Sequence, residues 1–165
     1  MFKETVRQEQ QTFVESTLSS VVAALQRELG ERMMALVLFG SRARGDATST
    51  SDWDLFLVAT QLPERPFQRH LYIKRILPRE WRAALAILAK TPTEFESTLI
   101  PLYLDLAMDG ILLYDSDNYM TNHLAAIRQT LQKKGLYRIQ DGRELVWRWG
   151  KAPKVEWELE WGPVR

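Results

Sequence analysis

Residues 39–58, FGSRARGDATSTSDWDLFLV, carry side chains that suit the binding of phosphate groups. Gly40 and Ser41 directly follow a short apolar run that predicts a buried strand. Glycine lets the backbone approach a ligand closely, and backbone amides at the start of a helix point at anions. The Ser41 hydroxyl can add a hydrogen bond, and Arg42 or Arg44 can offset negative charge. The turn therefore predicts a cradle for phosphate oxygens.

Two carboxylates, Asp52 and Asp54, stand at the head of the next predicted strand. Because side chains alternate between the faces of a strand, both leave the same face, about 6.6 Å apart along the backbone, while Trp53 faces the other way. Such a pair can converge on one hard cation, which keeps phosphates and waters among its ligands. Each motif alone is common in ordinary turns and caps. Together they indicate metal-assisted phosphoryl or nucleotidyl transfer.

The residues that carry a family resemblance are Gly40-Ser41, Arg42, Arg44-Gly45 and Ser51-Asp52-x-Asp54. They resemble the minimal nucleotidyltransferase family of the DNA polymerase beta superfamily. The resemblance implies that Gly40 and Ser41 bind the phosphates of a nucleotide, with Arg42 or Arg44 offsetting charge. It also implies that Asp52 and Asp54 are catalytic residues that bind Mg²⁺, together with a third Asp on a neighbouring strand.

A function follows from this resemblance. It implies a Mg²⁺-dependent nucleotidyltransferase that moves an NMP from an NTP, expected to be ATP, to an acceptor hydroxyl. The acceptor in similar enzymes is a small molecule such as an antibiotic, or a tyrosine of a HEPN-type partner in toxin–antitoxin pairs. A looser resemblance extends through residues 91–97 and 102–115.

The third carboxylate is missing from the position where the resemblance places it. That position falls at about Ala86, in a predicted strand at 81–90 that contains no acid. Glu80, Glu94 or Asp105 could fill the role. Otherwise the chain is a weakened enzyme, or a nucleotide-binding, antitoxin-like interaction module without activity. The sequence leaves these alternatives open.

Hydrophobic periodicity and breaker residues predict the elements that position the motif. An amphipathic helix at 4–29 has an apolar stripe that includes Phe13, and Gly30 ends it. Thr91-Pro92-Thr93-Glu94 predicts a capping box that opens one helix running to about Asp109. The remaining expectations are strands at 33–39, 52–59, 81–90 and 111–114, a loop or short helix at 42–51, helices at 67–77 and 118–134, and two or three short strands after Gly135.

This order of elements predicts an α/β (α+β) fold, and the resemblance makes it a nucleotidyltransferase fold. It has a mixed β-sheet flanked by helices and a short C-terminal β extension. Residues 1–134 would form the nucleotidyltransferase domain, including the N-terminal helix. Residues 135–165 would form a Trp-rich β extension packed on the same domain.

Charge is distributed unevenly along the 165 residues. The net charge is only +1, but residues 61–90 carry +5, residues 91–118 carry −6 and residues 128–165 carry +4. Of the 22 Lys and Arg, 7 lie in residues 61–90 and 9 in residues 128–165, so two basic blocks stand on either side of an acidic one. The expected anion is a triphosphate bound by a local turn and a metal, and direct binding of nucleic acid is not expected. With no Cys, no apolar run near 18 residues and a polar N-terminus, we expect a cytoplasmic protein without a membrane span.

Four of the six Trp lie in the last 19 residues, among basic side chains. Trp147 and Trp149 alternate as in a strand, which predicts a hairpin packed on the domain. Stacking of these aromatics on nucleobases is the alternative. His70 and His123 have no companions at metal-ligand spacing, so no zinc site is expected.

Overall fold

The computed structural model describes residues 2–141 and 144–150. The elements in chain order are α1 (Phe2–Leu29), the 3₁₀ turn η1 (Gly30–Arg32), β1 (Met33–Phe39), α2 (Gly40–Arg44), β2 (Trp53–Ala59), α3 (Pro66–Ile76), the 3₁₀ turn η2 (Arg79–Trp81), β3 (Leu85–Lys90), α4 (Pro92–Ser97), α5 (Pro101–Asp109), β4 (Ile111–Asp115), α6 (Tyr119–Lys134), β5 (Leu136–Asp141) and β6 (Glu144–Trp149).

Four strands form the central sheet in the order β3-β2-β1-β4. Strand β1 pairs antiparallel with both β2 and β4, whereas β2 and β3 run parallel. The sheet is therefore mixed, as the sequence predicts. The parallel pair needs a crossover, which α3 supplies. Strands β5 and β6 form a separate antiparallel hairpin.

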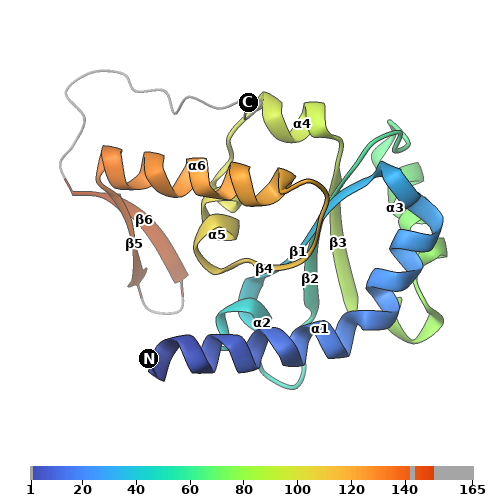
Figure 1. Ribbon diagram of the computed structural model, residues 1–165, viewed down its shortest axis with the longest axis horizontal. Coiled ribbons are helices and arrows are strands. Elements are labelled where there is room, and N and C mark those ends of the chain that lie inside the picture. Colours follow the sequence, from blue (N-terminus) through green and yellow to red (C-terminus); the bar gives the residue numbers. More distant parts are fainter. Residues whose placement is uncertain (1, 142–143, 151–165) are drawn as a thin grey trace.

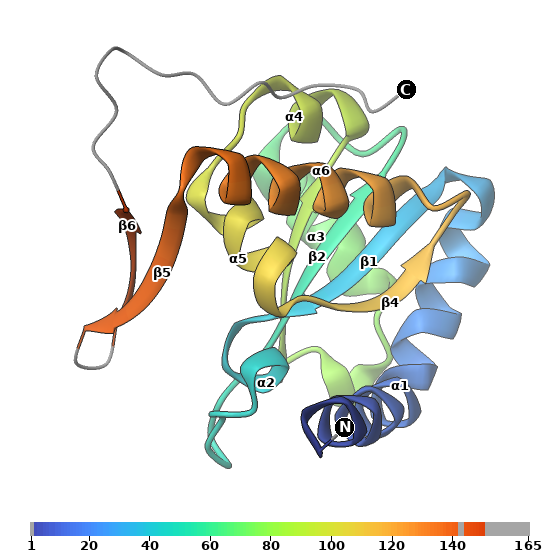
Figure 2. The ribbon, with the colours of Figure 1, turned by 60° about the vertical axis from the view of Figure 1, so that its left-hand side comes forward.

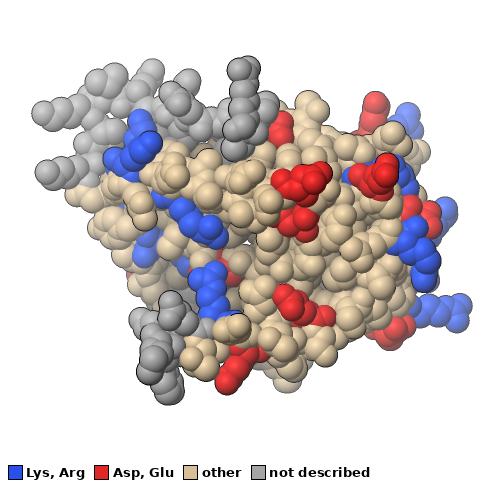
Figure 3. All heavy atoms as spheres, in the orientation of Figure 1, with Lys and Arg blue, Asp and Glu red and all other residues tan. Residues whose placement is uncertain are grey.

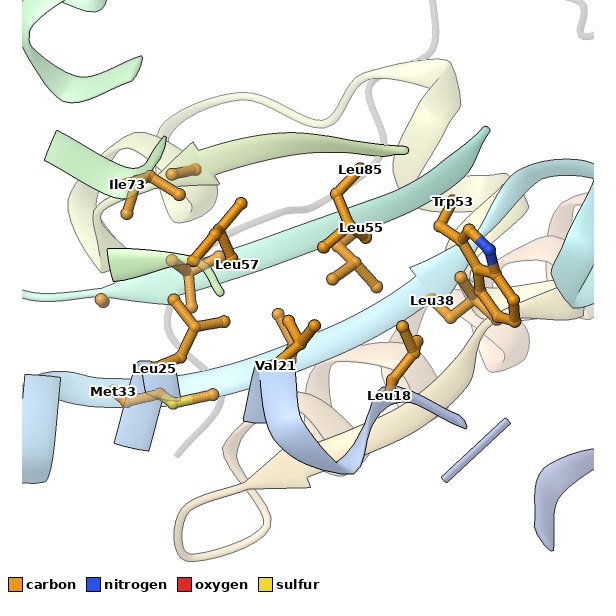
Figure 4. Close-up of a cluster of buried hydrophobic side chains, with 14 of the residues drawn as sticks. Leu18, Val21, Leu25, Met33, Leu38, Trp53, Leu55, Leu57, Ile73 and Leu85 are labelled. Atoms are coloured by element: carbon orange, nitrogen blue, oxygen red, sulfur yellow. The ribbon is translucent and has the colours of Figure 1, made fainter. Parts of the chain in front are cut away.

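The sheet lies between two layers of helices (Figures 1 and 2). On one face, α1 and α3 cover alternate residues of β1 and β2, and Figure 4 shows Leu18, Val21 and Leu25 of α1 packed toward Leu55 and Leu57 of β2. On the other face, α4, α5 and α6 cover the residues in between, around the buried rings of Phe56, Phe95 and Tyr103. Asp54 leaves β2 on this second face, because it alternates with Trp53 and Leu55.

Most of the predicted elements are confirmed within one to four residues. The strand expected at 81–90 begins later, at Leu85, after the turn η2. The capping box is present: Glu94 N donates to Thr91 Oγ1 at 3.2 Å, and Thr91 N donates to Glu94 Oε2 at 2.9 Å. Any third strand beyond Gly150 lies outside the described residues, as do Trp157 and Trp161.

Two expectations about helices are wrong. The single helix expected from Pro92 to Asp109 is two helices, α4 and α5, separated by extended backbone at residues 98–100. Pro101 explains the break, because proline disfavours helical conformation in the residue before it and starts a new helix readily. Phe13 is not on the buried stripe of α1: it is 64% exposed, and its neighbour Val14 is buried instead.

The β5–β6 hairpin docks on α5 through Arg138. Its Nη1 lies 2.8 Å from Asp105 Oδ1 and its Nη2 lies 2.6 Å from Asp109 Oδ2. Trp147 Nε1 donates to Asp105 Oδ1 at 3.2 Å. Burial opposes the charged form of Arg138, but its pairing with the two carboxylates outweighs burial and raises the pKa of its guanidinium. Trp147 therefore packs against α5 and the core cluster on that face of the sheet.

Replacing Arg138 with Met should lower the free energy of unfolding by about 2–4 kcal/mol, because two partly buried carboxylates lose their partner. Arg148→Met is the matched control, since Arg148 lies 3.5 Å from an exposed carboxylate, Asp141. That control should change stability by no more than about 0.5 kcal/mol. Urea denaturation measures both, and equal losses would mean that the Arg138 pairs do not dock the hairpin.

Candidate nucleotide and metal site

The phosphate cradle predicted from Gly40-Ser41 lies at the turn between β1 and α2. Gly40 has a φ of +75°, a conformation that L side chains rarely adopt. It is the first residue of α2, so its amide and those that follow stand in the first helical turn, where backbone N–H groups have no helical partner. No hydrogen bond of the Ser41 hydroxyl is found among the described residues, which leaves Oγ available to a ligand.

Gly40 also makes room for Asp54. Phe39 pairs with Asp54 across the antiparallel β1–β2 ladder, so the carboxylate lies beside the Gly40 backbone. A Cβ on Gly40 would come within 2.5 Å of Asp54 Oδ2. The Asp54 oxygen therefore occupies the space that a side chain on residue 40 would need, so the position of this carboxylate depends on the glycine.

Asp52 and Asp54 interact electrostatically, although only Asp54 lies within β2. Asp52 is exposed in the loop just before the strand, and Asp54 is half-buried. The pKa of Asp54 is raised, first by burial and then by the negative charge of Asp52, and it is lowered in part by Arg44. A bound cation would stabilise the charged form of this half-buried carboxylate and offset its repulsion by Asp52.

Arg42 and Arg44 have different surroundings. Arg42 donates from Nε and Nη2 to the carbonyl oxygen of Ser51 at 3.0 and 2.6 Å, and its guanidinium lies 4.4 Å from the centre of the Trp53 ring. Because Trp53 and Asp54 leave opposite faces of β2, this side chain clamps the loop at 45–52 and stands away from the Asp54 face. Arg44 is exposed, lies 3.2 Å from Asp46 and acts electrostatically on Asp54.

Sequence reasoning missed the residues that hold this loop in place. Gln10 of α1 donates from Nε2 to the carbonyl oxygens of Arg42 and Ala43, both at 3.0 Å. Trp53 packs edge-on against Trp81, with ring centroids 5.9 Å apart, and Trp81 Nε1 donates to Ser20 Oγ at 3.1 Å. The sequence contained one sign of these contacts: the alternation of side chains along the strand, which places Trp53 on the face that α1 covers.

The residue opposite the Asp pair on the neighbouring strand is Ala86. In the parallel β2–β3 register Asp54 pairs with Ala86, so the two side chains leave the same face of the sheet. Ala86 is exposed, as is Leu88, the next residue of β3 on that face. Within residues 2–141 and 144–150, no group of three or more His, Cys, Asp or Glu side chains is placed to hold a metal ion.

The three alternative acids have other surroundings. Glu94 lies beyond the far end of β3, where both of its oxygens accept from Arg69, at 2.6 and 3.0 Å. Asp105 is held by Arg138 and Trp147 of the hairpin. Glu80 is exposed in η2, next to Trp81, which packs with the cluster on the α1 face of the sheet. None of the three lies beside Asp54 to replace the acid missing at Ala86.

Glu94 gives a pH-dependent contribution to stability. Its hydrogen bonds to Arg69 are the main cause that lowers the pKa of its carboxyl below the ordinary 4.5. A carboxylate with a lowered pKa in the folded state stabilises the fold above its ordinary pKa, and the gain is lost as pH falls through the lower value. Glu94→Gln should therefore lower the thermal midpoint at pH 7, and the difference from wild type should shrink below about pH 4.5. Exposed Glu80→Gln is the control, and a pH-independent difference for Glu94→Gln would contradict this assignment.

Known proteins match the part of the chain that carries this site. The model of the family described as polymerase beta, nucleotidyltransferase, matches residues 20–119, which is more than half of the chain. The chain belongs to this nucleotidyltransferase family. The matched range contains the Gly40-Ser41 turn, the Asp pair and Ala86.

Individual relatives agree with this family assignment. The nucleotidyltransferase is 28% identical over 120 residues to a Methanocaldococcus jannaschii protein named as a candidate protein adenylyltransferase, covering 70% of this chain and 82% of that protein. A toxin–antitoxin structure with AMP-PNP has a TM-score of 0.52 at 15% identity, and a mutant of the MntA–HpeT toxin–antitoxin has 0.50 at 12%. Each alignment covers 70% of this chain and 86% of the other chain, and at this identity the structures show the shared fold alone.

The residues present fit a divalent cation held by two carboxylates. Asp52 and Asp54 supply oxygen ligands, and the pKa of Asp54 is raised by burial first and by the charge of Asp52 second, which Arg44 offsets only in part. They do not supply the three-carboxylate set that the sequence resemblance implies, because Ala86 has no oxygen to offer. Among the described residues no helix combines the length and apolar character needed to cross a membrane.

Proposed function

We propose that this protein transfers an NMP from an NTP, with ATP as the expected donor, to a hydroxyl group of an acceptor in the presence of Mg²⁺. The acceptor oxygen would form a bond to the α-phosphorus, the bond to the β-phosphate would break, and pyrophosphate would leave while the hydroxyl loses its proton. The observation that carries the proposal is the close approach of the Asp54 carboxylate to Gly40, next to Ser41, whose hydroxyl has no hydrogen-bond partner among the described residues.

Each residue has a role that follows from its position. The amides at Gly40 and Ser41, with Ser41 Oγ, would bind the β- and γ-phosphates. Asp52 and Asp54 would hold Mg²⁺, which when bound neutralises phosphate charge and polarises the reacting phosphoryl group. Arg44, whose charge already acts on Asp54, would offset the remaining phosphate charge. Arg42 would keep the loop at 45–52 in place through Ser51 and Trp53.

The acceptor is proposed as a partner protein of the HEPN type or a small molecule. The support is the candidate protein adenylyltransferase among the relatives and the toxin–antitoxin complexes among the structures with the same fold. Either acceptor would have to approach the face of the sheet that carries Asp54, next to Ala86.

A second candidate is a nucleotide-binding interaction module of the same fold with little or no activity. Ala86 is the specific observation in its favour, because a metal site with one ligand fewer would activate the acceptor hydroxyl poorly. In this alternative the protein binds ATP and its partner without turnover.

Label transfer distinguishes the two candidates. The full-length protein is incubated with Mg²⁺, ATP labelled at the α- or the γ-phosphate, and a nucleotide-free protein fraction of the source cells as acceptor. The transferase predicts label from the α-phosphate on an acceptor, lost in Asp54→Asn. Label from the γ-phosphate would exclude nucleotidyl transfer, and ATP binding without any label transfer would favour the interaction module.

A further inference from the structure

A cavity of about 470 Å³ lies between the C-terminal ends of α5 and α6 and the β5–β6 hairpin. We call it the hairpin cavity, and its chemistry is set by Met108, Arg128, Gln132, Tyr137 and Trp147. Its size falls in the range of small-molecule sites, roughly 300–1,000 Å³. Its walls are apolar and aromatic, with one cation and one amide available for hydrogen bonding.

Arg128 is the cation whose hydrogen-bonding capacity is only partly used. Its Nε donates to the carbonyl oxygen of Ala107 at 2.6 Å, which stabilises the end of α5. In the part of the chain that the structure describes, its two terminal Nη groups have no hydrogen-bond or ion-pair partner. A guanidinium offers five N–H donors in a planar fork, so the free end of Arg128 suits a phosphate or a carboxylate.

A second arginine adds to the positive charge at Arg128. The pKa of Arg128 is lowered by partial burial and then by the charge of Arg7 on α1, so the two guanidinium groups repel each other. Arg7 is exposed, and it too has no hydrogen-bond or ion-pair partner among residues 2–141 and 144–150. Figure 3 shows basic side chains gathered on this side of the molecule, near α6 and the hairpin, with acidic ones nearer the middle. An anion bound at Arg128 would relieve this repulsion.

The opposite wall of the hairpin cavity offers aromatic surface. Tyr137 is 48% exposed, and the indole of Trp147 is fixed by its hydrogen bond to Asp105 and by the guanidinium of Arg138, 5.7 Å from the ring centre. Aromatic side chains beside a cation are the usual means of stacking a nucleobase near its phosphate. The Gln132 amide can donate to or accept from the edge of a base.

We propose that the hairpin cavity binds a nucleoside monophosphate, with the phosphate on Arg128 and the base against Tyr137. This site consists of α5, α6 and hairpin residues and shares none of its lining residues with the cradle at Gly40-Ser41. It needs no divalent cation, because the anion is bound by guanidinium. The proposal is independent of nucleotidyl transfer, and binding would persist in a protein whose Asp pair is disabled.

The test is calorimetric titration of the full-length Asp54→Asn protein in EDTA with AMP, adenosine and inorganic phosphate. AMP should bind at one site per chain and more tightly than either fragment. Arg128→Gln should weaken AMP binding at least about tenfold, because charge-assisted hydrogen bonds are lost. Tyr137→Ala should weaken AMP about tenfold while leaving the affinity for phosphate unchanged.

Lys133→Gln is the matched control, since it removes an exposed cation of α6 that does not line the cavity. Its AMP affinity should equal that of the parent. The proposal is overturned if AMP does not bind in EDTA, if Lys133→Gln weakens binding as much as Arg128→Gln, or if Tyr137→Ala leaves AMP affinity unchanged. The Tyr137 variant keeps the test decisive should Arg128→Gln unfold. Label transfer by the wild-type enzyme is scored separately, so failure here says nothing against it.

Discussion

Replacing Ala86 with Asp is expected to raise the rate of nucleotidyl transfer by about a hundredfold or more. The β2–β3 register places residue 86 directly opposite Asp54, on the same face of the sheet. Neighbouring strands lie about 4.8 Å apart, so a carboxylate there would stand beside the Asp pair. A third carboxylate completes the ligand set, and better charge stabilisation worth about 2.7 kcal/mol gives a hundredfold. Steady-state transfer of α-phosphate label measures the gain.

The same substitution has a readout that does not depend on activity. Without metal, Ala86→Asp adds a third negative charge and should lower the thermal midpoint. Added Mg²⁺ should then raise the midpoint more than it does in the wild-type protein, because a ligand that binds only the folded state stabilises it by mass action. Asp54→Asn in the same background should remove the extra rise.

Leu88→Asp is the matched control for Ala86→Asp. Leu88 lies two residues further along β3, on the same face, is 38% exposed and pairs with Phe56, so the new charge falls away from Asp54. It should give neither faster transfer nor a larger Mg²⁺-dependent stabilisation. If Ala86→Asp binds Mg²⁺ better but transfers no faster than wild type, the missing carboxylate is not what limits activity.

Part of the fold around Ala86 can be predicted from the sequence alone. The strands at 33–39 and 53–59 are apolar runs with clear breakers beside them, so their positions are local properties. The family resemblance places the missing acid at about Ala86, shortly before the capping box predicted at Thr91 and Glu94. In the β2–β3 register, residue 86 is the partner of Asp54.

The contacts of Arg42 could not be predicted in the same way. A basic residue after Gly40-Ser41 is equally suited to a phosphate and to a carbonyl oxygen. Arg42 contacts Ser51 and Trp53 only once the loop at 45–52 has folded back, and Gln10 of α1 holds α2 in place beside them. The Gln10 contact joins residues 32 apart and the Ser51 contact residues 9 apart, and no periodic pattern in the sequence encodes either.

The blocks of charge have a structural explanation that the sequence did not disclose. Arg69, from the basic block at 61–90, pairs with Glu94, and Arg138, from the basic C-terminal block, pairs with Asp105 and Asp109. Both basic blocks therefore contact the acidic block between them. Among the residues that the structure describes, Arg128 of the C-terminal block keeps two Nη groups without a partner, and this arginine carries the proposed nucleotide site in the hairpin cavity.

Replacing Gly40 with Ala is expected to abolish transfer and to lower the free energy of unfolding by about 2 kcal/mol or more. Two costs add up: an alanine at a φ of +75° is strained, and its Cβ would lie 2.5 Å from Asp54 Oδ2. The carboxylate would have to leave its place beside the cradle, so metal and nucleotide would lose their common site. Transfer of α-phosphate label and urea denaturation measure the two effects.

Gly135→Ala separates these costs, because Gly135 has a similar φ of +67° with nothing within 4 Å of an added Cβ. It should cost only the backbone strain, about 1 kcal/mol, and leave transfer unchanged. Combining Gly40→Ala with Asp54→Ala removes the collision, so Gly40→Ala should destabilise the Asp54→Ala protein no more than Gly135→Ala destabilises the wild type. An equal loss for Gly40→Ala with and without the Asp54 carboxylate would mean that the two residues are not coupled, and the cradle and the metal site would then have to be treated as separate features.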